Sequence, residues 1–420
     1  MADIASTSDS TVDSPFTKEF GDQNPIKRSD KSPFLAALSG VFKGRVQWLL
    51  ALAITAVPAF ASGIQYVCDT TVSASVCTTL QTNIAGQYAA IFTNANAIIY
   101  VEVGGTGSSV SENTQFYNTV SYAAYYDALV AHESGANDAT AVVSLRGGTT
   151  NPVGSSDGVA VTSSLDAALG LAGAYGVNTS DQSCTIGNSG CYNDIITVSK
   201  SLAFYYDIGS YISGEYDFFT AVEHETDEAL GTSSCIANTP GGTAPTPSSG
   251  CANGQYGQAI PGVSAADLFR YSAPGTRTFV GANGNQAEGS SAYFSINGGK
   301  TPIAWYNNTN NDNDYGDWEA ACKYVQDAVG CNNSTSAGLN ITNDGGAEVA
   351  ALDAVGYNLT NYGEVISGIN PVAAPEPDTT ELVAWGLLAV LAGGIVRRRS
   401  SARRKVSDRC MGKCSIEAKC

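Results

Sequence analysis

The stretch His224-Glu225-Thr226-Asp227-Glu228 decides how this chain is interpreted. Side chains four positions apart project from one face of a helix. His224 and Glu228 could therefore bind one metal ion, while Glu225 reaches a water molecule bound to that ion. The sequence thus predicts a metal site carried by a single helix turn.

The residues around this stretch favour a helix. Phe218, Phe219 and Val222 recur at helical spacing, and Gly231 stands where a helix C-cap glycine belongs. We predict a helix from Gly214 to Leu230. Its sequence differs from the HExxHxxG signature of zinc peptidases by one ligand, because a glutamate replaces the second histidine.

Cysteine usage places the protein in an oxidising compartment. The chain has 420 residues and 11 cysteines, more than a typical cytosolic protein contains. Eight of them form neighbouring pairs, which predicts four short disulfides: Cys68/Cys77, Cys184/Cys191, Cys235/Cys251 and Cys322/Cys331. The remaining three, from Cys410 onward, lie beyond the last apolar segment.

Two apolar segments bracket the paired cysteines. Trp48 to Phe60 follows basic residues and ends in a small-x-small site, so residues 1–61 are predicted to be an N-terminal extension with a signal peptide cut before Ser62. An uncleaved anchor is the alternative. Leu382 to Val396 precedes an arginine cluster, which is typical of a cytoplasmic flank. Residues 62–370 are then the exported domain and 371–420 a membrane and sorting segment.

The charge distribution agrees with export. Between Ser62 and Glu381 the chain has six basic and 31 acidic residues. Nucleic acids and anionic membrane surfaces are poor partners for such a domain. The expected partners are a protein or peptide substrate and the export and C-terminal sorting machinery. Leu382 to Val396 would anchor the protein transiently in the membrane, and the mature protein would be secreted or held at the cell surface.

The remaining patterns predict an α+β domain. Ala97 to Val103 and Thr140 to Leu145 are expected to be strands, and Gln115 to His132 and Ser163 to Ala174 helices. Early strands and a central site helix suggest a zincin-like layout, in which a mixed sheet packs on the helix that holds the metal.

The chain resembles a family of bacterial metalloproteases that carry a PEP-CTERM sorting signal. Pro375-Glu376-Pro377, the apolar segment and the arginines resemble that signal. Further resemblance lies in the HExxE helix and in the blocks DLFRYSAPG (267–275), AYFSINGG (292–299), DYGDW (314–318) and ALDAVGY (351–357). The last block also resembles the helix that closes the catalytic domain of matrixin-like secreted zincins, which makes the expected fold metzincin-related.

This resemblance implies a zinc-dependent endopeptidase, with His224 and Glu228 as metal ligands and Glu225 as general base. The zinc would acidify its water and polarise the scissile carbonyl. Glu225 would take the proton from that water and pass it to the leaving amine.

The third ligand is not given by the motif, because Ser234 stands where the longer signature has another histidine. No methionine lies between Met1 and Met411, so a methionine turn is absent. Zinc needs three protein ligands, and Asp267 in the DLFR block is the preferred candidate. Alternatively Asp267 caps a helix or pairs with Arg270.

Other candidates for the third ligand are Glu348, Asp353 and His132, of which His132 is better explained as a helix-end residue. A site with one imidazole and two carboxylates also suits Mn²⁺, which is the alternative to Zn²⁺. Alternating oxygen donors at Asn310, Asp312 and Asp314 suggest Ca²⁺, or else a solvated turn.

Other catalytic classes have weaker support. The only Gly-x-Ser-x-Gly match, residues 154–158, lies in a polar loop and not at a strand-to-helix turn. No P-loop or dinucleotide fingerprint is present. A paired-carboxylate glycosidase stays open because acidic pairs are numerous. The main alternative to a peptidase is a non-catalytic cell-surface or matrix protein on a degenerate zincin scaffold.

Overall fold

The computed structural model describes residues 63–152, 158–171, 173, 175–235, 263–278, 292–307, 315–319 and 322–368. The predicted signal peptide, the sorting segment and the proposed calcium ligands Asn310, Asp312 and Asp314 lie outside these residues. No helix among the described residues is both long and apolar enough to cross a membrane.

A mixed sheet forms the frame of the N-terminal half. Its strands lie in the order β1 (Ile64–Cys68), β2 (Ala97–Gly104), β8 (Asp194–Ser199) and β3 (Ser111–Gln115). The first three are parallel, and β3 runs antiparallel to β8 at the outer edge. Alternate β2 residues Ile99 and Val101 are fully buried, which is the period-two pattern of a strand. The strand predicted from Ala97 to Val103 is confirmed.

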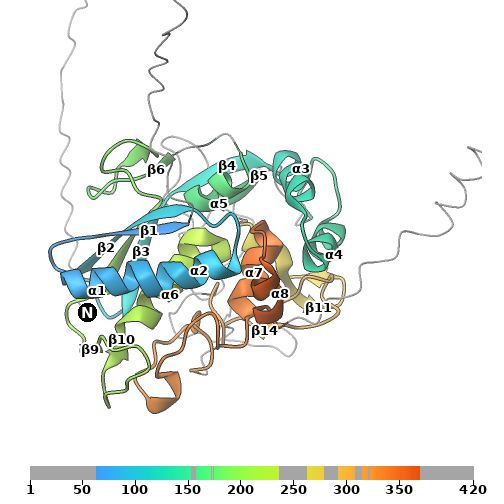
Figure 1. Ribbon diagram of the computed structural model, residues 1–420. Coiled ribbons are helices and arrows are strands. Elements are labelled where there is room, and N and C mark those ends of the chain that lie inside the picture. Colours follow the sequence, from blue (N-terminus) through green and yellow to red (C-terminus); the bar gives the residue numbers. More distant parts are fainter. Residues whose placement is uncertain are drawn as a thin grey trace, which may run out of the picture. The chain divides into compact units, whose positions relative to one another are not determined.

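Helices cover this sheet (Figure 1). The run α1 (Ala74–Thr79), η1 (Leu80–Ile84) and α2 (Ala85–Ile91) crosses in front of the strands. Helix α6 (Phe218–Asp227) packs against β8 and β3. Two buried tyrosines tie these layers together: the Tyr66 hydroxyl lies 3.0 Å from the Thr226 hydroxyl, and Tyr88 donates to Asp227 at 2.6 Å. The sheet therefore packs on the helix with the HExxE stretch.

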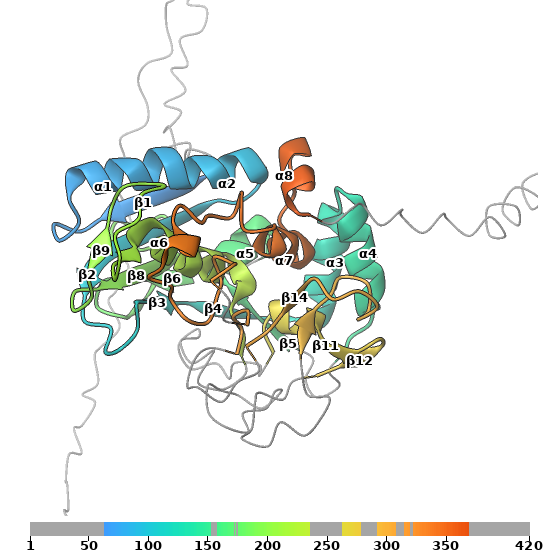
Figure 2. The same ribbon diagram turned by 90° about the horizontal axis from the view of Figure 1, so that it is seen from below.

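The other elements follow around this frame (Figure 2). Helices α3 (Tyr122–His132) and α4 (Ala136–Leu145) pack together, and α4 also packs on α7 (Ala347–Val355), which α8 (Asn361–Ile366) follows. Strand β4 (Tyr117–Ser121) pairs with β5 (Gly158–Thr162), which leads into α5 (Ser163–Ala168). The shorter elements are β6 (Tyr175–Val177), β7 (Ser183–Thr185), β9 (Phe204–Tyr205), β10 (Tyr216–Asp217), η2 (Glu228–Thr232), η4 (Ala266–Phe269), β11 (Arg270–Ala273), β12 (Thr276–Arg277), β13 (Tyr293–Phe294), β14 (Ala304–Trp305) and η5 (Ser334–Ser336). The protein is of the α+β class.

Several secondary-structure predictions were wrong in whole or in part. The helix predicted from Ser163 to Ala174 ends at Ala168. Thr140 to Leu145 is the end of helix α4, not a strand; Asp138 closes the start of that helix by accepting from the backbone N–H of Gly135 at 3.0 Å. The helix predicted to begin at Gln115 begins at Tyr122, because the preceding residues form β4. Ser121 then caps α3 through Ala124.

Three of the predicted disulfides are present: Cys68–Cys77, Cys184–Cys191 and Cys322–Cys331. Cys235 is also disulfide-bonded, and its predicted partner Cys251 lies outside the described residues. Each of the three observed bonds closes a short loop, which limits local unfolding of that loop.

Candidate metal centre

Helix α6 begins where the chain leaves strand β10. The Asp217 carboxylate accepts hydrogen bonds from the backbone N–H groups of Phe219 at 2.9 Å and Thr220 at 3.4 Å, as an N-cap residue does. The helix predicted from Gly214 starts later because β10 pairs with β9. This cap defines the residue at which the helix begins.

The helix continues beyond Asp227 into the π-helical turn η2. Gly231 in this turn has φ +133°, a backbone conformation that residues other than glycine rarely adopt. A Cβ atom there would lie 3.3 Å from Leu165. The glycine predicted to end the site helix is therefore needed for both conformation and packing.

Three side chains converge at this helix. His224 and Glu228, one turn apart, lie beside Asp317, and one potential ligand atom of each lies within 4.8 Å of those of the other two. The His224 Nε2 atom is 3.7 Å from Asp317 Oδ1. Within the described part of the chain, these three residues form a group of histidine and acidic side chains that could hold a metal ion.

Hydrogen bonds orient two of these candidate ligands. His224 Nδ1 lies 3.0 Å from the Val325 carbonyl, so a proton on Nδ1 leaves the Nε2 lone pair for a metal. Glu228 Oε2 accepts from Asn113 at 2.6 Å and Gln115 at 3.4 Å. The other carboxylate oxygen of Glu228, Oε1, lies on the side of the centre of the group. Such outer contacts are characteristic of metal ligands.

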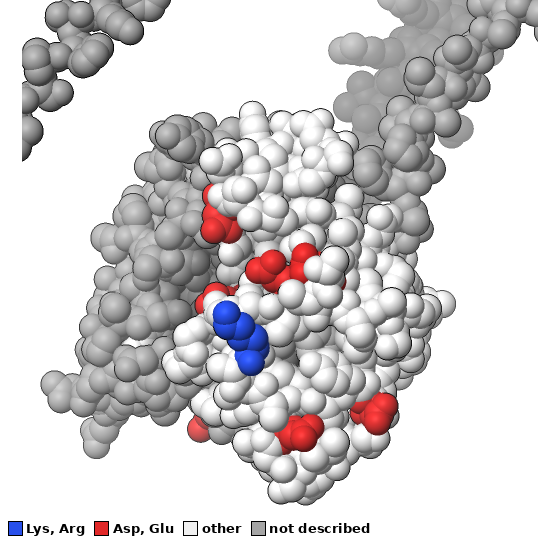
Figure 3. Space-filling model, turned by 90° about the vertical axis from the view of Figure 1, so that its left-hand side faces the viewer, with Lys and Arg blue, Asp and Glu red and all other residues white. Residues whose placement is uncertain are grey.

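The site favours a positive charge. Burial lowers the pKa of His224, but the carboxylates of Glu225 and Glu228 and the Val325 carbonyl raise it more, so the pKa lies above its ordinary value. On the face of the molecule in Figure 3, acidic side chains are also more widespread than basic ones. A cation at the centre of the group would meet a negative environment.

The amide of Gln326 lies in contact with all three candidate ligands. Its Nε2 atom is 3.1 Å from His224 Nε2, 3.1 Å from Asp317 Oδ1 and 3.5 Å from Glu228 Oε1. The Gln326 side chain is buried, with 1% of its surface exposed. The three atoms that it contacts, His224 Nε2, Asp317 Oδ1 and Glu228 Oε1, can each accept a hydrogen bond or bind a metal ion.

The group opens onto a cleft of about 450 Å³. Glu225 lines this cleft together with the three ligands, and so do Ser111, Glu112 and Asn113 of the outer strand β3. Burial and, secondly, the charge of Glu225 raise the pKa of Asp194, the first residue of β8. The predicted base, the predicted metal helix and a sheet edge thus border one space.

The structure does not bring Asp267 into this group. Its carboxylate accepts from the Ser234 hydroxyl at 2.6 Å, from the Cys235 backbone at 2.9 Å and from the Ser264 backbone at 2.8 Å. The Ser264 hydroxyl accepts in return from the Asp267 N–H at 3.2 Å. This reciprocal pair is a capping box. Asp267 therefore has the local capping role that the sequence left as the alternative.

The other candidates for the third ligand also lie elsewhere. Glu348 Oε1 accepts from Trp318 Nε1 at 2.9 Å and from the Gln326 backbone at 3.0 Å, so it supports the segments that carry Asp317 and Gln326. Burial and then the charge of Asp138 raise the pKa of Asp353, which lies where α7 packs on α4. His132 is in the last turn of α3, as expected for a helix-end residue.

Asp317 was missed from the sequence, although it lies in the DYGDW block on which the family resemblance rests. The pattern alone did not separate it from the run of asparagines and aspartates just before it. Its backbone carbonyl accepts from Asn307 at 2.7 Å, and the adjacent Trp318 forms bridges with Tyr306 and Asp327. The 3.7 Å distance between Asp317 Oδ1 and His224 Nε2 shows that Asp317 faces α6.

The donor set fits a divalent metal ion. One imidazole nitrogen and two carboxylate oxygens are ligands that Zn²⁺ and Mn²⁺ both accept, and three protein ligands are the number found in catalytic zinc sites. No protein-family model, curated protein or solved structure matches this chain.

Proposed function

We propose that the protein is an exported, metal-dependent endopeptidase on a zincin-like fold, with Zn²⁺ as the preferred ion. The observation that carries this proposal is the convergence of His224, Glu228 and Asp317 beside Glu225 in one cleft. Asp317 replaces Asp267 as the third ligand. The mixed sheet packed on α6 supports the zincin-like fold.

When bound, the metal would supply Lewis-acid polarisation of the scissile carbonyl and acidify a water. His224, Glu228 and Asp317 would hold it, with His224 fixed by Val325 and Glu228 by Asn113. Glu225 would accept a proton from the attacking water and deliver it to the leaving nitrogen. Only 4% of the Glu225 surface is exposed, which limits competing contact with solvent.

The outer strand β3 offers a way to bind the substrate. An edge strand presents unpaired backbone N–H and C=O groups to which an extended peptide can add. Ser111, Glu112 and Asn113 of β3 line the cleft. The substrate is therefore an extended polypeptide, and the acidic surroundings favour neutral or basic residues near the scissile bond.

Export is supported by the disulfides and by the excess of acidic residues between Ser62 and Glu381. Segments 1–61 and 371–420 would direct export and sorting, and the second would anchor the protein before it is released or retained at the surface. These roles belong to the proposal because both segments lie outside the described residues.

The test compares the oxidatively folded full chain with Glu225→Gln. Glu223→Gln is the matched control, because it makes the same change on the same helix but away from the cleft. The wild type should hold one equivalent of metal and cleave an unfolded protein substrate. Glu225→Gln should keep the metal and lose roughly 10²- to 10⁴-fold in kcat, while the control keeps both. Equal activity in Glu225→Gln, or no metal in the wild type, would overturn the proposal.

A second function is favoured by the contact between Gln326 and the ligands. A side chain at that position would take the place of a water ligand, as in structural metal sites. The protein would then be a non-catalytic surface or matrix protein that uses its metal for stability. Metal content without any cleavage, in the wild type and in variants of Gln326, would select this alternative.

A further inference from the structure

The distances around Gln326 have the dimensions of a metal coordination shell. Four ligands held about 2.0–2.1 Å from a zinc ion at tetrahedral angles lie about 3.3–3.4 Å from one another. The Gln326 amide lies 3.1, 3.1 and 3.5 Å from the ligand atoms of His224, Asp317 and Glu228, and the first two are 3.7 Å apart. Gln326 thus lies about as far from each of the three atoms as a fourth ligand of such a shell would.

We propose that Gln326 is the fourth ligand of the resting metal centre and stands in the position that an attacking water needs. This inference rests on the metal site of the proposed function and deepens it: the centre is closed at rest. Catalytic zinc sites keep one position open. Cleavage would then require that the side chain of Gln326 leaves the metal.

The amide can serve with either orientation. With Nε2 toward the group, it donates to the ligand atoms, which suits the protein without metal. With Oε1 toward the group, the carbonyl oxygen is a neutral metal ligand. The Thr232 hydroxyl lies 3.5 Å from Oε1, and a hydroxyl can donate to Oε1 or accept from Nε2. A rotation of the amide by half a turn therefore keeps this partner.

The backbone of Gln326 is held on both sides. Its N–H donates to Glu348 at 3.0 Å, and its carbonyl accepts from the Trp318 N–H at 2.8 Å. Because Trp318 follows Asp317, the two segments that bring Asp317 and Gln326 to the centre are bonded to each other. The position of Gln326 is therefore a built feature of the site and not that of a mobile surface side chain.

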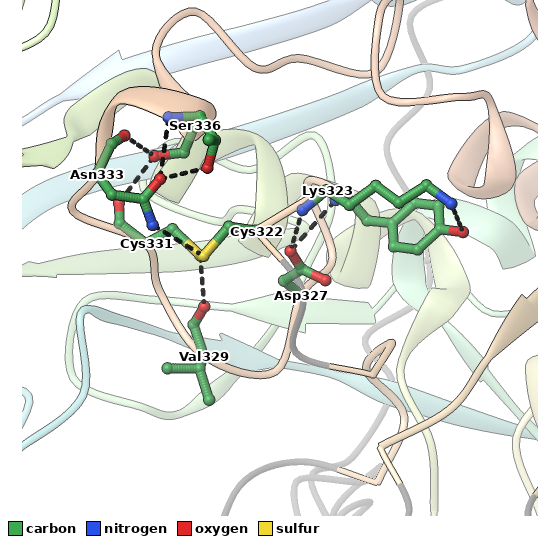
Figure 4. The surroundings of a disulfide bond; sticks show 9 residues. Cys322, Lys323, Asp327, Val329, Cys331, Asn333 and Ser336 are labelled. Carbon is green, nitrogen blue, oxygen red and sulfur yellow. Dashed lines mark hydrogen bonds between the residues drawn. A yellow bond between two sulfur atoms is a disulfide. The ribbon is translucent and has the colours of Figure 1, made fainter.

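A disulfide closes the loop that carries Gln326 (Figure 4). Cys322–Cys331 joins its ends, and the Asp327 carboxylate accepts from the N–H groups of Lys323 at 2.6 Å and Tyr324 at 3.2 Å. The same loop supplies the Val325 carbonyl to His224. One covalently closed loop thus orients one ligand and places another.

A neutral amide oxygen binds a cation more weakly than a carboxylate does, because it has no net charge. It can therefore yield to a stronger ligand, whereas His224, Glu228 and Asp317 stay in place. A bound anion measures this displacement directly, without reference to cleavage. Azide is a suitable probe because it binds metals at an open position.

The experiment measures azide affinity by the visible absorption of the Co²⁺-substituted full-length protein. Gln326→Ala should bind azide at least about tenfold more tightly than the wild type, since no ligand has to be displaced. Gln326→Met, which keeps the volume but has no oxygen donor, should behave similarly if the alanine variant folds poorly. Gln182→Ala, which removes the same amide at an exposed position that does not line the cleft, is the matched control and should bind azide like the wild type.

The outcomes separate this inference from the proposed function. If the wild type takes up one equivalent of Co²⁺ but binds azide as tightly as both Gln326 variants, Gln326 is not a ligand, although the metal site stands. If the wild type takes up no metal, the proposed function fails and the inference fails with it. Tighter azide binding in both variants, without change in Gln182→Ala, supports a closed centre.

Discussion

The two sides of helix α6 carry carboxylates in contrasting surroundings. On the cleft side, Glu228 accepts hydrogen bonds from Asn113 and Gln115 through one oxygen. On the interior side, Glu223 is 1% exposed, and among the described residues neither of its oxygens has a hydrogen-bond partner. Asp227 receives one hydrogen bond, from Tyr88. Donors are thus supplied to one side of the helix and largely withheld from the other.

This contrast separates the chemistry of the two sides. Burial, and secondly the charge of Asp227, raise the pKa of Glu223 well above its ordinary value; burial also raises the pKa of Asp227. These groups are stable inside the protein as neutral acids. Glu228 instead has donors that stabilise its charged form, which is the form that binds metal. Glu223 and Asp227 are four residues apart, and so are His224 and Glu228. Because the spacing is the same, the surroundings of each pair decide its role.

The largest expected effect is on metal binding. Glu228→Ala removes a ligand and should weaken zinc affinity by more than about 100-fold, since loss of an outer contact alone costs 10- to 100-fold. Asp227→Asn, one position away on the interior side, should leave zinc affinity within about twofold. Competition with a chelator measures both. Equal loss in the two variants would show that the contrast between the sides has no bearing on metal binding.

A smaller effect is expected for the donor that orients Glu228. Asn113→Ala removes the 2.6 Å hydrogen bond to Glu228 Oε2 and should weaken zinc affinity by roughly 10- to 100-fold. Asn118→Ala on the neighbouring strand β4 makes the same chemical change away from the centre and is the control. An unchanged zinc affinity in Asn113→Ala would mean that this outer contact does not set the position of Glu228.

The interior side should respond in the opposite direction. Glu223→Met replaces a buried carboxyl without hydrogen-bond partners by an apolar side chain of similar length, and the cost of such a buried polar group is about 1–3 kcal/mol. We therefore expect a higher free energy of unfolding in urea at pH 7. Glu228→Met, measured with zinc present, should instead be less stable because metal binding is lost. A destabilised Glu223→Met would reveal a polar role for this side chain.

A further prediction concerns pH. Burial raises the pKa of Asp166 in α5 from its ordinary value near 3.8 to about 7. Because the pKa of Asp166 is raised in the folded state, its protonated form contributes stability that is fully present below the ordinary pKa. This contribution is lost as the pH rises through about 7. Relative to Asp166→Asn, the wild type should therefore lose stability from about pH 4 to about pH 7 and then stay level. Urea unfolding at several pH values measures this difference, and a difference independent of pH would contradict the raised pKa.

The wrong predictions for Thr140 to Leu145 and for Tyr117 to Ser121 share a physical cause. Thr140, Val142 and Val143 have strand propensity, yet this stretch continues a helix that begins at Ala136 and packs on α3 and α7. The apolar residues from Tyr117 to Ser121 fit a helical pattern when they are counted together with those of α3. In the structure this stretch is instead a strand that pairs with β5. Tertiary packing decides the secondary structure of a segment when its helix and strand propensities differ by little.

The sequence by itself determined the features that depend on neighbours along the chain. His224 and Glu228 share a face because a helix repeats every 3.6 residues, Gly231 ends the helical run because it tolerates a positive φ, and nearby cysteines pair in short loops. Only the tertiary structure decided the rest of the centre. Asp317 and Gln326 reach α6 through backbone pairing around Trp318, while Asp267 is held away by its own capping box. Contacts between distant segments depend on how whole elements pack, and no spacing in the sequence encodes that.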